Sequence, residues 1–106
     1  MKIVAVTACT IGVAHTYIAQ DKLTIAAQKR GHSIKVETQG NVGQENLLTP
    51  NDIANADVVI LASDINITGQ DRFKGKPVVR VSASIAIKQP EKLIEKIEQK
   101  MKGASS

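Results

Sequence analysis

The sequence has few of the residues on which several classes of small protein depend. Its 106 residues include one cysteine, no tryptophan, one tyrosine and one phenylalanine. A single cysteine, Cys9, cannot form an internal disulfide, which excludes the disulfide-rich secreted modules. The low glycine count and three prolines exclude a collagen-like rod, and the 42% hydrophobic content excludes a disordered chain. The composition is that of one globular domain with an aliphatic core.

Long apolar runs are also missing. The run at residues 1–7 is too short for a signal peptide, and no later run reaches the ~20 residues that cross a bilayer. We therefore expect a cytoplasmic protein. The net charge is +4, but the basic residues are scattered, and in the C-terminal segment they alternate with Glu91, Glu95 and Glu98. With two aromatic residues to stack on bases, the sequence predicts no nucleic-acid partner.

Four short runs rich in Ile and Val predict the strands of a parallel sheet, because β-branched residues favour buried strands. A helix is expected over residues 15–30, with Gly31 as a C-cap before the next strand. Its predicted apolar face consists of Ala14, Ile18, Ile25 and Ala26. The four strand runs are residues 2–8, 33–38, 56–63 and 77–82.

Two further helices have recognisable start signals. Thr49 precedes Pro50 as an N-cap, and Asp52 is placed to complete a capping box. The last helix begins at Pro90 and carries an apolar stripe. Alternating strands and helices predict an α/β domain with an open four-stranded parallel sheet, order 2-1-3-4, and helices on both faces. Ligands of such folds bind outside the carboxyl ends of the strands.

Cys9 directly follows the first predicted strand and precedes the first helix. Backbone amides converge at such a helix N-terminus, and the positive end of the helix dipole attracts anions. This environment would lower the pKa of the Cys9 thiol and favour the thiolate, a nucleophile suited to phosphorus. The same position also suits a small buried cysteine without a chemical role.

The spacing after Cys9 resembles that of the cysteine-based phosphatases, in which five residues separate the cysteine from an arginine that is followed by Ser or Thr. Here His15 takes the place of the arginine and Thr16 follows. A histidine offers fewer donors and no permanent charge, so we expect poor hydrolysis of a phosphoryl group held on sulfur. An ordinary surface role for His15, and a hydrogen bond from Thr16 to a preceding carbonyl, are the alternatives.

Six further features of the sequence occur in a characteristic order. They are AVTAC ending at Cys9, GVAHTY from Gly12, VETQG from Val36, Glu45-Asn46 with Leu48-Thr49, ADVVILA from Ala56 and DRFKGKPV from Asp71. Together they resemble the enzyme IIB component of the phosphoenolpyruvate-dependent sugar phosphotransferase system, fructose family. The resemblance extends from Lys2 to about Ile97, nearly the whole chain.

The resemblance implies a phosphocarrier domain over residues 1–102, with a tail at 103–106. Cys9 would accept a phosphoryl group from the phosphohistidine of a IIA component and pass it to a sugar of fructose or mannose type held by the IIC membrane permease. Contact with the inner face of the membrane would be transient, through IIC. No metal or cofactor is expected. The phosphate-binding loop would consist of Thr10, Ile11, Gly12, Val13, Ala14, His15 and Thr16.

Two residues depart from the family pattern, which usually reads Cys-Pro-Thr-Gly. This chain has Thr10 and Ile11 after Cys9. The missing proline restores an amide donor, and Ile11 lacks the hydroxyl of threonine. A low-molecular-weight cysteine phosphatase and a degenerate IIB with a regulatory role stay open as alternatives. A flavodoxin-like binding module is a third, with only Tyr17 and Phe73 to flank a flavin.

Four other polar residues near strand ends were considered for chemical roles. We expect Asp64 to cap a turn rather than act as a general acid. Thr38 and Gln39 are expected to shape the loop after their strand, and Gln39 could also contact a partner. His32 is expected to be an exposed turn residue. The two histidines and Cys9 lack the paired spacing of zinc ligands.

Overall fold

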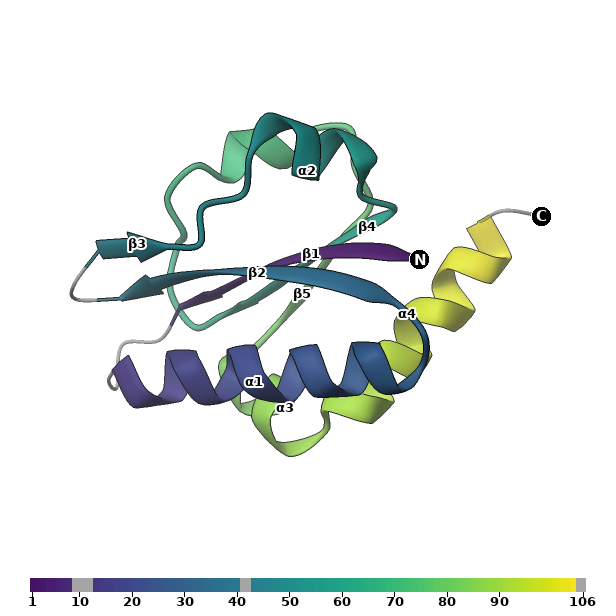
Figure 1. The fold of residues 1–106 in the computed structure, drawn as a ribbon, viewed down its shortest axis with the longest axis horizontal. Coiled ribbons are helices and arrows are strands. Elements are labelled where there is room, and N and C mark those ends of the chain that lie inside the picture. The colour runs from purple at the N-terminus through teal and green to yellow at the C-terminus, as the bar shows by residue number, and fades with distance from the viewer. Residues whose placement is uncertain (9–12, 41–42, 105–106) are drawn as a thin grey trace.

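A β-sheet forms the middle layer of the domain, and helices cover both of its faces (Figure 1). The computed structural model describes residues 1–8, 13–40 and 43–104, with the side chains of residues 1–8, 15–39 and 46–101. The strands are β1 (Lys2–Ala8), β2 (Ser33–Gly40), β3 (Gly43–Glu45), β4 (Val58–Ser63) and β5 (Val78–Val81). The helices are α1 (Val13–Lys29), α2 (Pro50–Asn55), the 3₁₀ helix η1 (Gln70–Phe73), α3 (Ala83–Lys88) and α4 (Pro90–Ala104).

The strand order is β3-β2-β1-β4-β5. Strands β2, β1, β4 and β5 are parallel, so the predicted four-stranded parallel sheet of order 2-1-3-4 is confirmed. The short strand β3 pairs antiparallel with β2 at the edge of the sheet. The sequence analysis missed β3 because its three residues, Gly-Gln-Glu, contain no β-branched or apolar residue.

The predicted helix signals have the expected geometry. The Thr49 hydroxyl accepts a hydrogen bond from the Asp52 amide at 3.1 Å, and the Asp52 carboxylate accepts one from the Thr49 amide at 2.9 Å, which completes the capping box. Gly31 ends the first helical segment with a φ of 81°, a left-handed conformation that glycine adopts without strain. Helix α4 begins at Pro90 and ends at Ala104, so the tail predicted from Gly103 starts inside the helix.

Each face of the sheet buries its own apolar cluster, because successive strand residues point to opposite faces. Ile3 and Ile60 pack with residues of α1, α3 and α4. Val4 and Leu61 pack with residues of α2 and η1. Figure 1 shows these helices as separate layers above and below the sheet. The central strands are therefore buried on both faces, as parallel strands usually are.

The predicted apolar face of α1 is partly wrong. Ile18 and Ile25 are 41% and 56% exposed, whereas Leu23 is fully buried. The buried side of α1 is otherwise made of small residues, which let the helix lie close to the sheet and leave little room for isoleucine. The buried residues of α1 are Thr16, Ala19, Leu23, Ala26 and Ala27. Ala14 lies outside the residues whose side chains are described.

A charged cluster fixes α4 to the end of α1. Arg30 donates two hydrogen bonds to the Glu98 carboxylate, at 2.9 and 2.6 Å, and Glu98 also contacts the ring of His32. The Met1 ammonium group donates a further hydrogen bond to Nδ1 of the His32 ring at 2.9 Å. The expectation that His32 is an exposed turn residue is therefore wrong, because its side chain is only 12% exposed.

Acid titration tests this cluster. Hydrogen bonds from Arg30 and then from His32 lower the pKa of Glu98 to about 2, from an ordinary value of 4.5. The resulting stabilisation is present above about pH 4.5 and is lost as the pH falls toward 2. We expect Glu98→Gln to lower the Tm at about pH 6 but to change it little near pH 2, by circular dichroism. Glu91→Gln, which removes an exposed carboxylate that pairs with Lys29, is the control; an equal Tm loss for Glu98→Gln at both pH values would contradict the assignment.

Candidate functional site

The carboxyl ends of the parallel strands meet the N-terminal end of α1 at one edge of the domain (Figure 1). Strand β1 ends at Ala8, which is paired with Gln39 of β2 on one side and with Ser63 of β4 on the other. Helix α1 begins five residues later, at Val13. The candidate nucleophile Cys9 therefore follows directly in sequence from the centre of this edge.

The predicted nucleophile and part of the predicted phosphate-binding loop lie outside the described residues. The nucleophile is Cys9, and the loop residues are Thr10, Ile11 and Gly12. Val13 and Ala14 are the first two residues of α1, and only their backbone is described. The first four amide groups of an α-helix have no partner within the helix, and a helix N-terminus is for this reason a common place for an anion to bind.

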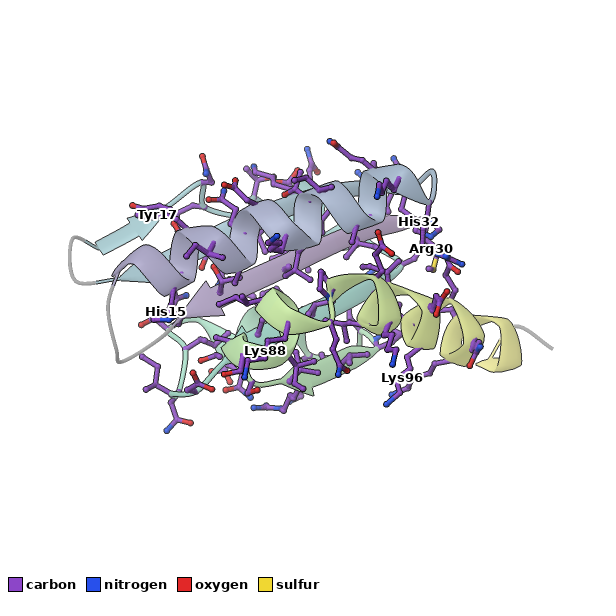
Figure 2. All side chains as sticks on the ribbon, turned by 90° about the horizontal axis from the view of Figure 1, so that it is seen from below. His15, Tyr17, Arg30, His32, Lys88 and Lys96 are labelled. Atoms are coloured by element: carbon purple, nitrogen blue, oxygen red, sulfur yellow. The ribbon has the colours of Figure 1, made fainter. Side chains whose placement is uncertain are left out.

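His15 and Thr16 occupy the first turn of α1 and differ in exposure. His15 is exposed, at the end of α1 opposite to Arg30 and His32 (Figure 2). Thr16 is only 1% exposed, and its carbonyl accepts a hydrogen bond from the Thr7 hydroxyl at 3.2 Å. The Thr16 hydroxyl is buried without a hydrogen-bond partner among the described residues. A bond from the Thr16 hydroxyl to a preceding carbonyl, the alternative given above, is therefore not found within the described part of the chain.

A buried carboxylate that the sequence analysis missed lies next to this edge. Glu37 of β2 is fully buried. Its carboxylate accepts a bidentate pair of hydrogen bonds from Arg72 at 2.7 and 2.9 Å, one from the Gln39 amide group at 2.7 Å and one from the Leu48 backbone at 3.0 Å. Burial acts to raise the pKa of Glu37, but these hydrogen bonds, that of Arg72 first, outweigh it and hold the pKa below its ordinary value.

The same side chains also hold the segment that follows β4. The Gln39 side chain accepts a hydrogen bond from the Thr68 amide at 2.8 Å and donates one to the Thr68 carbonyl at 3.0 Å. Arg72 donates to the Thr68 carbonyl at 3.2 Å and to the Gly69 carbonyl at 2.7 Å. We call Glu37, Gln39 and Arg72, with these backbone partners, the Glu37 network. Gln39 therefore holds the segment after β4, whereas the loop after its own strand, residues 41–42, lies outside the described residues.

Asp64 contacts the start of a helix, and Thr38 is buried in the sheet. The Asp64 carboxylate accepts a hydrogen bond at 3.3 Å from the amide of Ala83, the first residue of α3. Asp64 was expected to cap a turn, and this bond instead joins it to the start of a helix 19 residues further along the chain. Thr38 is only 2% exposed on the face of the sheet opposite to Glu37. Among the described residues, no three His, Cys, Asp or Glu side chains are grouped as a metal site requires.

The sequence of the chain matches a known protein family. A family model described as "PTS system, Lactose/Cellobiose specific IIB subunit" matches residues 4–96. The chain belongs to this family of IIB subunits. Membership gives the chain a role in the sugar phosphotransferase system (PTS), which transfers phosphoryl groups, and confirms the predicted family.

Individual IIB relatives are named for fructose. The chain is 54% identical over 97 residues to the PTS system fructose-like EIIB component 2 of Escherichia coli (strain K12). The alignment covers 92% of each protein. The chain is 51% identical over 87 residues to the PTS system fructose-specific EIIB'BC component of Vibrio cholerae, which covers 82% of this chain but 15% of that protein. IIB sequences of this type therefore occur both alone and within longer polypeptides.

The IIB fold is also found in solved structures. The solution structure of the enzyme IIB subunit of the PTS from Escherichia coli K12 superimposes with a TM-score of 0.93 at 34% identity. The superposition covers 99% of this chain and 97% of that chain. In the described part of this IIB chain, no helix has the length and apolar character needed to cross a bilayer.

Proposed function

We propose that this IIB chain is a phosphocarrier. Cys9 accepts a phosphoryl group from the phosphohistidine of a IIA protein and passes it to a sugar of fructose or mannose type held by a IIC permease. The observation that carries the proposal is the place of Cys9, one residue beyond the central strand and just before a 17-residue helix, in a chain of the IIB family. A thiolate at such a helix N-terminus is stabilised by the backbone amides and the helix dipole.

The proposed reaction consists of two displacements at phosphorus. In the first, the Cys9 thiolate attacks the phosphoryl group, an S–P bond forms, the N–P bond breaks, and the donor histidine leaves as an imidazole. In the second, a sugar hydroxyl attacks, an O–P bond forms, the S–P bond breaks, and the thiolate is regenerated as the hydroxyl loses its proton. The transition states are loose and carry negative charge on the equatorial oxygens. The backbone amides at the start of α1 would stabilise that charge.

Retention of the phosphoryl group on sulfur distinguishes a carrier from a phosphatase. His15 stands where the phosphatase spacing has an arginine, so the chain lacks a permanently charged fork at that position. Weaker stabilisation of the transition state for attack by water leaves the phosphocysteine available to the sugar. This difference favours the carrier over the phosphatase that has the same spacing.

The cellular location of the chain follows from its proposed partners. The names of the EIIB'BC and EIIBC relatives indicate that IIB and IIC sequences can share one polypeptide. We infer that this chain works in the cytoplasm and contacts IIC transiently at the inner face of the membrane. The phosphoryl donor, IIA, would bind the same edge of the domain in turn, because both reactions use Cys9.

The decisive experiment is a relay reaction with the wild-type chain. Incubation with a phosphorylated IIA protein should place one phosphoryl group on the peptide that contains Cys9, detected by mass spectrometry under conditions that preserve phosphocysteine. Addition of membranes that contain the IIC permease and its sugar should then remove it. Rapid turnover of an aryl phosphate by the chain alone would favour the phosphatase instead.

The buried hydroxyl of Thr16 gives a second test of the proposed site. A buried hydroxyl without a partner destabilises a protein, so Thr16→Val should raise the free energy of unfolding by about 1 kcal/mol. If the hydroxyl serves the phosphoryl group, the same variant should accept phosphate about tenfold more slowly. Thermal unfolding and the rate of phosphorylation by IIA measure the two effects. Thr24→Val, whose hydroxyl donates to the Gln20 carbonyl on the same helix, is the control and should leave the rate unchanged.

A further inference from the structure

The stability of the fold does not by itself explain why a carboxylate is buried at Glu37. A carboxylate taken fully out of water loses several kcal/mol of hydration, which a well-placed arginine roughly recovers. An apolar pair of the same volume would stabilise the sheet equally well. The Glu37–Arg72 pair instead fixes the relative positions of its partners, because a bidentate pair has one geometry and both residues make further hydrogen bonds.

The network joins two loops that follow different strands. Glu37 accepts from the amide of Leu48, in the segment between β3 and α2. Gln39 and Arg72 hold Thr68, in the segment between β4 and η1. The second segment begins after Ser63, which is paired with Ala8, and Gln39 is the partner of Ala8 on the other side. Ala8 is the residue before Cys9 in the sequence. The network therefore connects its partner on one side, Gln39, to the segment that leaves the strand on its other side.

Both loops carry exposed apolar side chains. Leu47, beside Leu48, is 52% exposed, and Ile65, three residues before Thr68, is 43% exposed. Large apolar side chains of this exposure at a functional edge suit contact with another protein. A donor that brings its phosphohistidine to Cys9 has to approach this edge. One loop is hydrogen-bonded to Glu37 through Leu48, and the other is held by Gln39 and Arg72, which both donate to Glu37.

We propose that Glu37 and Arg72 are positioning residues for the phosphoryl donor: through Leu48 and Thr68 they fix two loops at the edge where β1 ends, and the IIA protein docks on these loops. The inference rests on the proposed function. It assigns the network to the binding of the donor and not to the reactivity of sulfur, because the bonds of Glu37 and Arg72 hold the backbone of the two loops. Loss of the network should therefore raise the KM for phosphorylated IIA and leave the maximal rate nearly unchanged.

The test compares two arginines that have the same kind of partner. Arg72→Lys keeps the charge but replaces the bidentate fork with a single ammonium group. Arg30→Lys makes the same change in the Arg30–Glu98 pair, at the opposite end of α1 from His15 (Figure 2). We expect Arg72→Lys to raise the KM for phosphorylated IIA about tenfold, with a maximal rate within about threefold of wild type. Arg30→Lys should change neither.

Two further measurements separate positioning from damage to the fold or the site. The rate of Cys9 alkylation by iodoacetamide, a probe that needs no docking, should match the wild type in Arg72→Lys. If Arg72→Lys does not fold, Gln39→Met replaces it, because this variant removes the two Gln39 hydrogen bonds to Thr68 and keeps the Glu37–Arg72 pair. An unchanged KM, or a lower maximal rate at constant KM, in a folded variant would overturn the inference alone. A wild-type chain that accepts no phosphate would overturn the proposed function as well.

Discussion

A Cys9→Ala variant is expected to accept no phosphoryl group from phosphorylated IIA and to support no phosphorylation of the sugar. The reason is that the sulfur is the only atom to which the proposed reaction attaches phosphorus, and alanine has no nucleophile at that position. Radiolabel transferred from phosphorylated IIA, and sugar phosphate formed in the presence of IIC, measure the two losses. The circular dichroism spectrum should be that of the wild type.

Histidine is the natural rival acceptor, since the donor itself carries phosphohistidine. The chain contains two histidines, and His15 is exposed in the first turn of α1. If Cys9→Ala still takes up label that resists base and is released by acid, as phosphohistidine does, the acceptor is a histidine and the Cys9 assignment is wrong. His15→Asn in the wild-type background is the matched control, and it should retain label on Cys9.

The second large effect concerns stability and is expected from two substitutions on α1. Leu23 is fully buried against the sheet, so Leu23→Ala should lower the free energy of unfolding by about 2–5 kcal/mol through lost burial and the cavity left behind. Ile25, two residues further along, is 56% exposed, and Ile25→Ala should cost less than about 0.5 kcal/mol. Urea denaturation followed by circular dichroism measures both values.

This pair of variants also tests the orientation of α1. The sequence pattern favoured Ile25 as a core residue, whereas the structure buries Leu23 with the small residues Ala19 and Ala27. A larger loss of stability for Ile25→Ala than for Leu23→Ala would mean that α1 is rotated from its described orientation. Because a domain of this size is stable by roughly 5–15 kcal/mol, the loss expected for Leu23→Ala is readily measured.

Local signals in the sequence predicted much of the fold. The capping box of Thr49 and Asp52 and the glycine at position 31 depend on residues within a few positions of each other, so they can be recognised before any tertiary contact is known. The parallel strands follow from runs of β-branched residues that are buried on both faces. The short elements β3, η1 and α3 were not predicted, because they have neither a run of β-branched residues, as β5 has, nor a capping box, as α2 has.

The environments of individual side chains depend on contacts between distant parts of the chain. Glu37 and Arg72 are 35 positions apart, and His32 and Glu98 are 66 positions apart. In the sequence, Glu37 is a charged residue within a strand and His32 a polar residue at a turn. The packing of α2 and η1 on one face of the sheet and of α4 beside α1 gives each of them its partner.

The sequence alone determined that this is one α/β domain of the IIB family with its single cysteine after the first strand. Those features depend on residue types and on short spacings along the chain. The tertiary structure alone decided which side of α1 is buried and that a buried carboxylate at Glu37 joins two loops beside the Cys9 edge. Burial and ion pairing are properties of segments brought together by folding, and no local pattern in the chain records them.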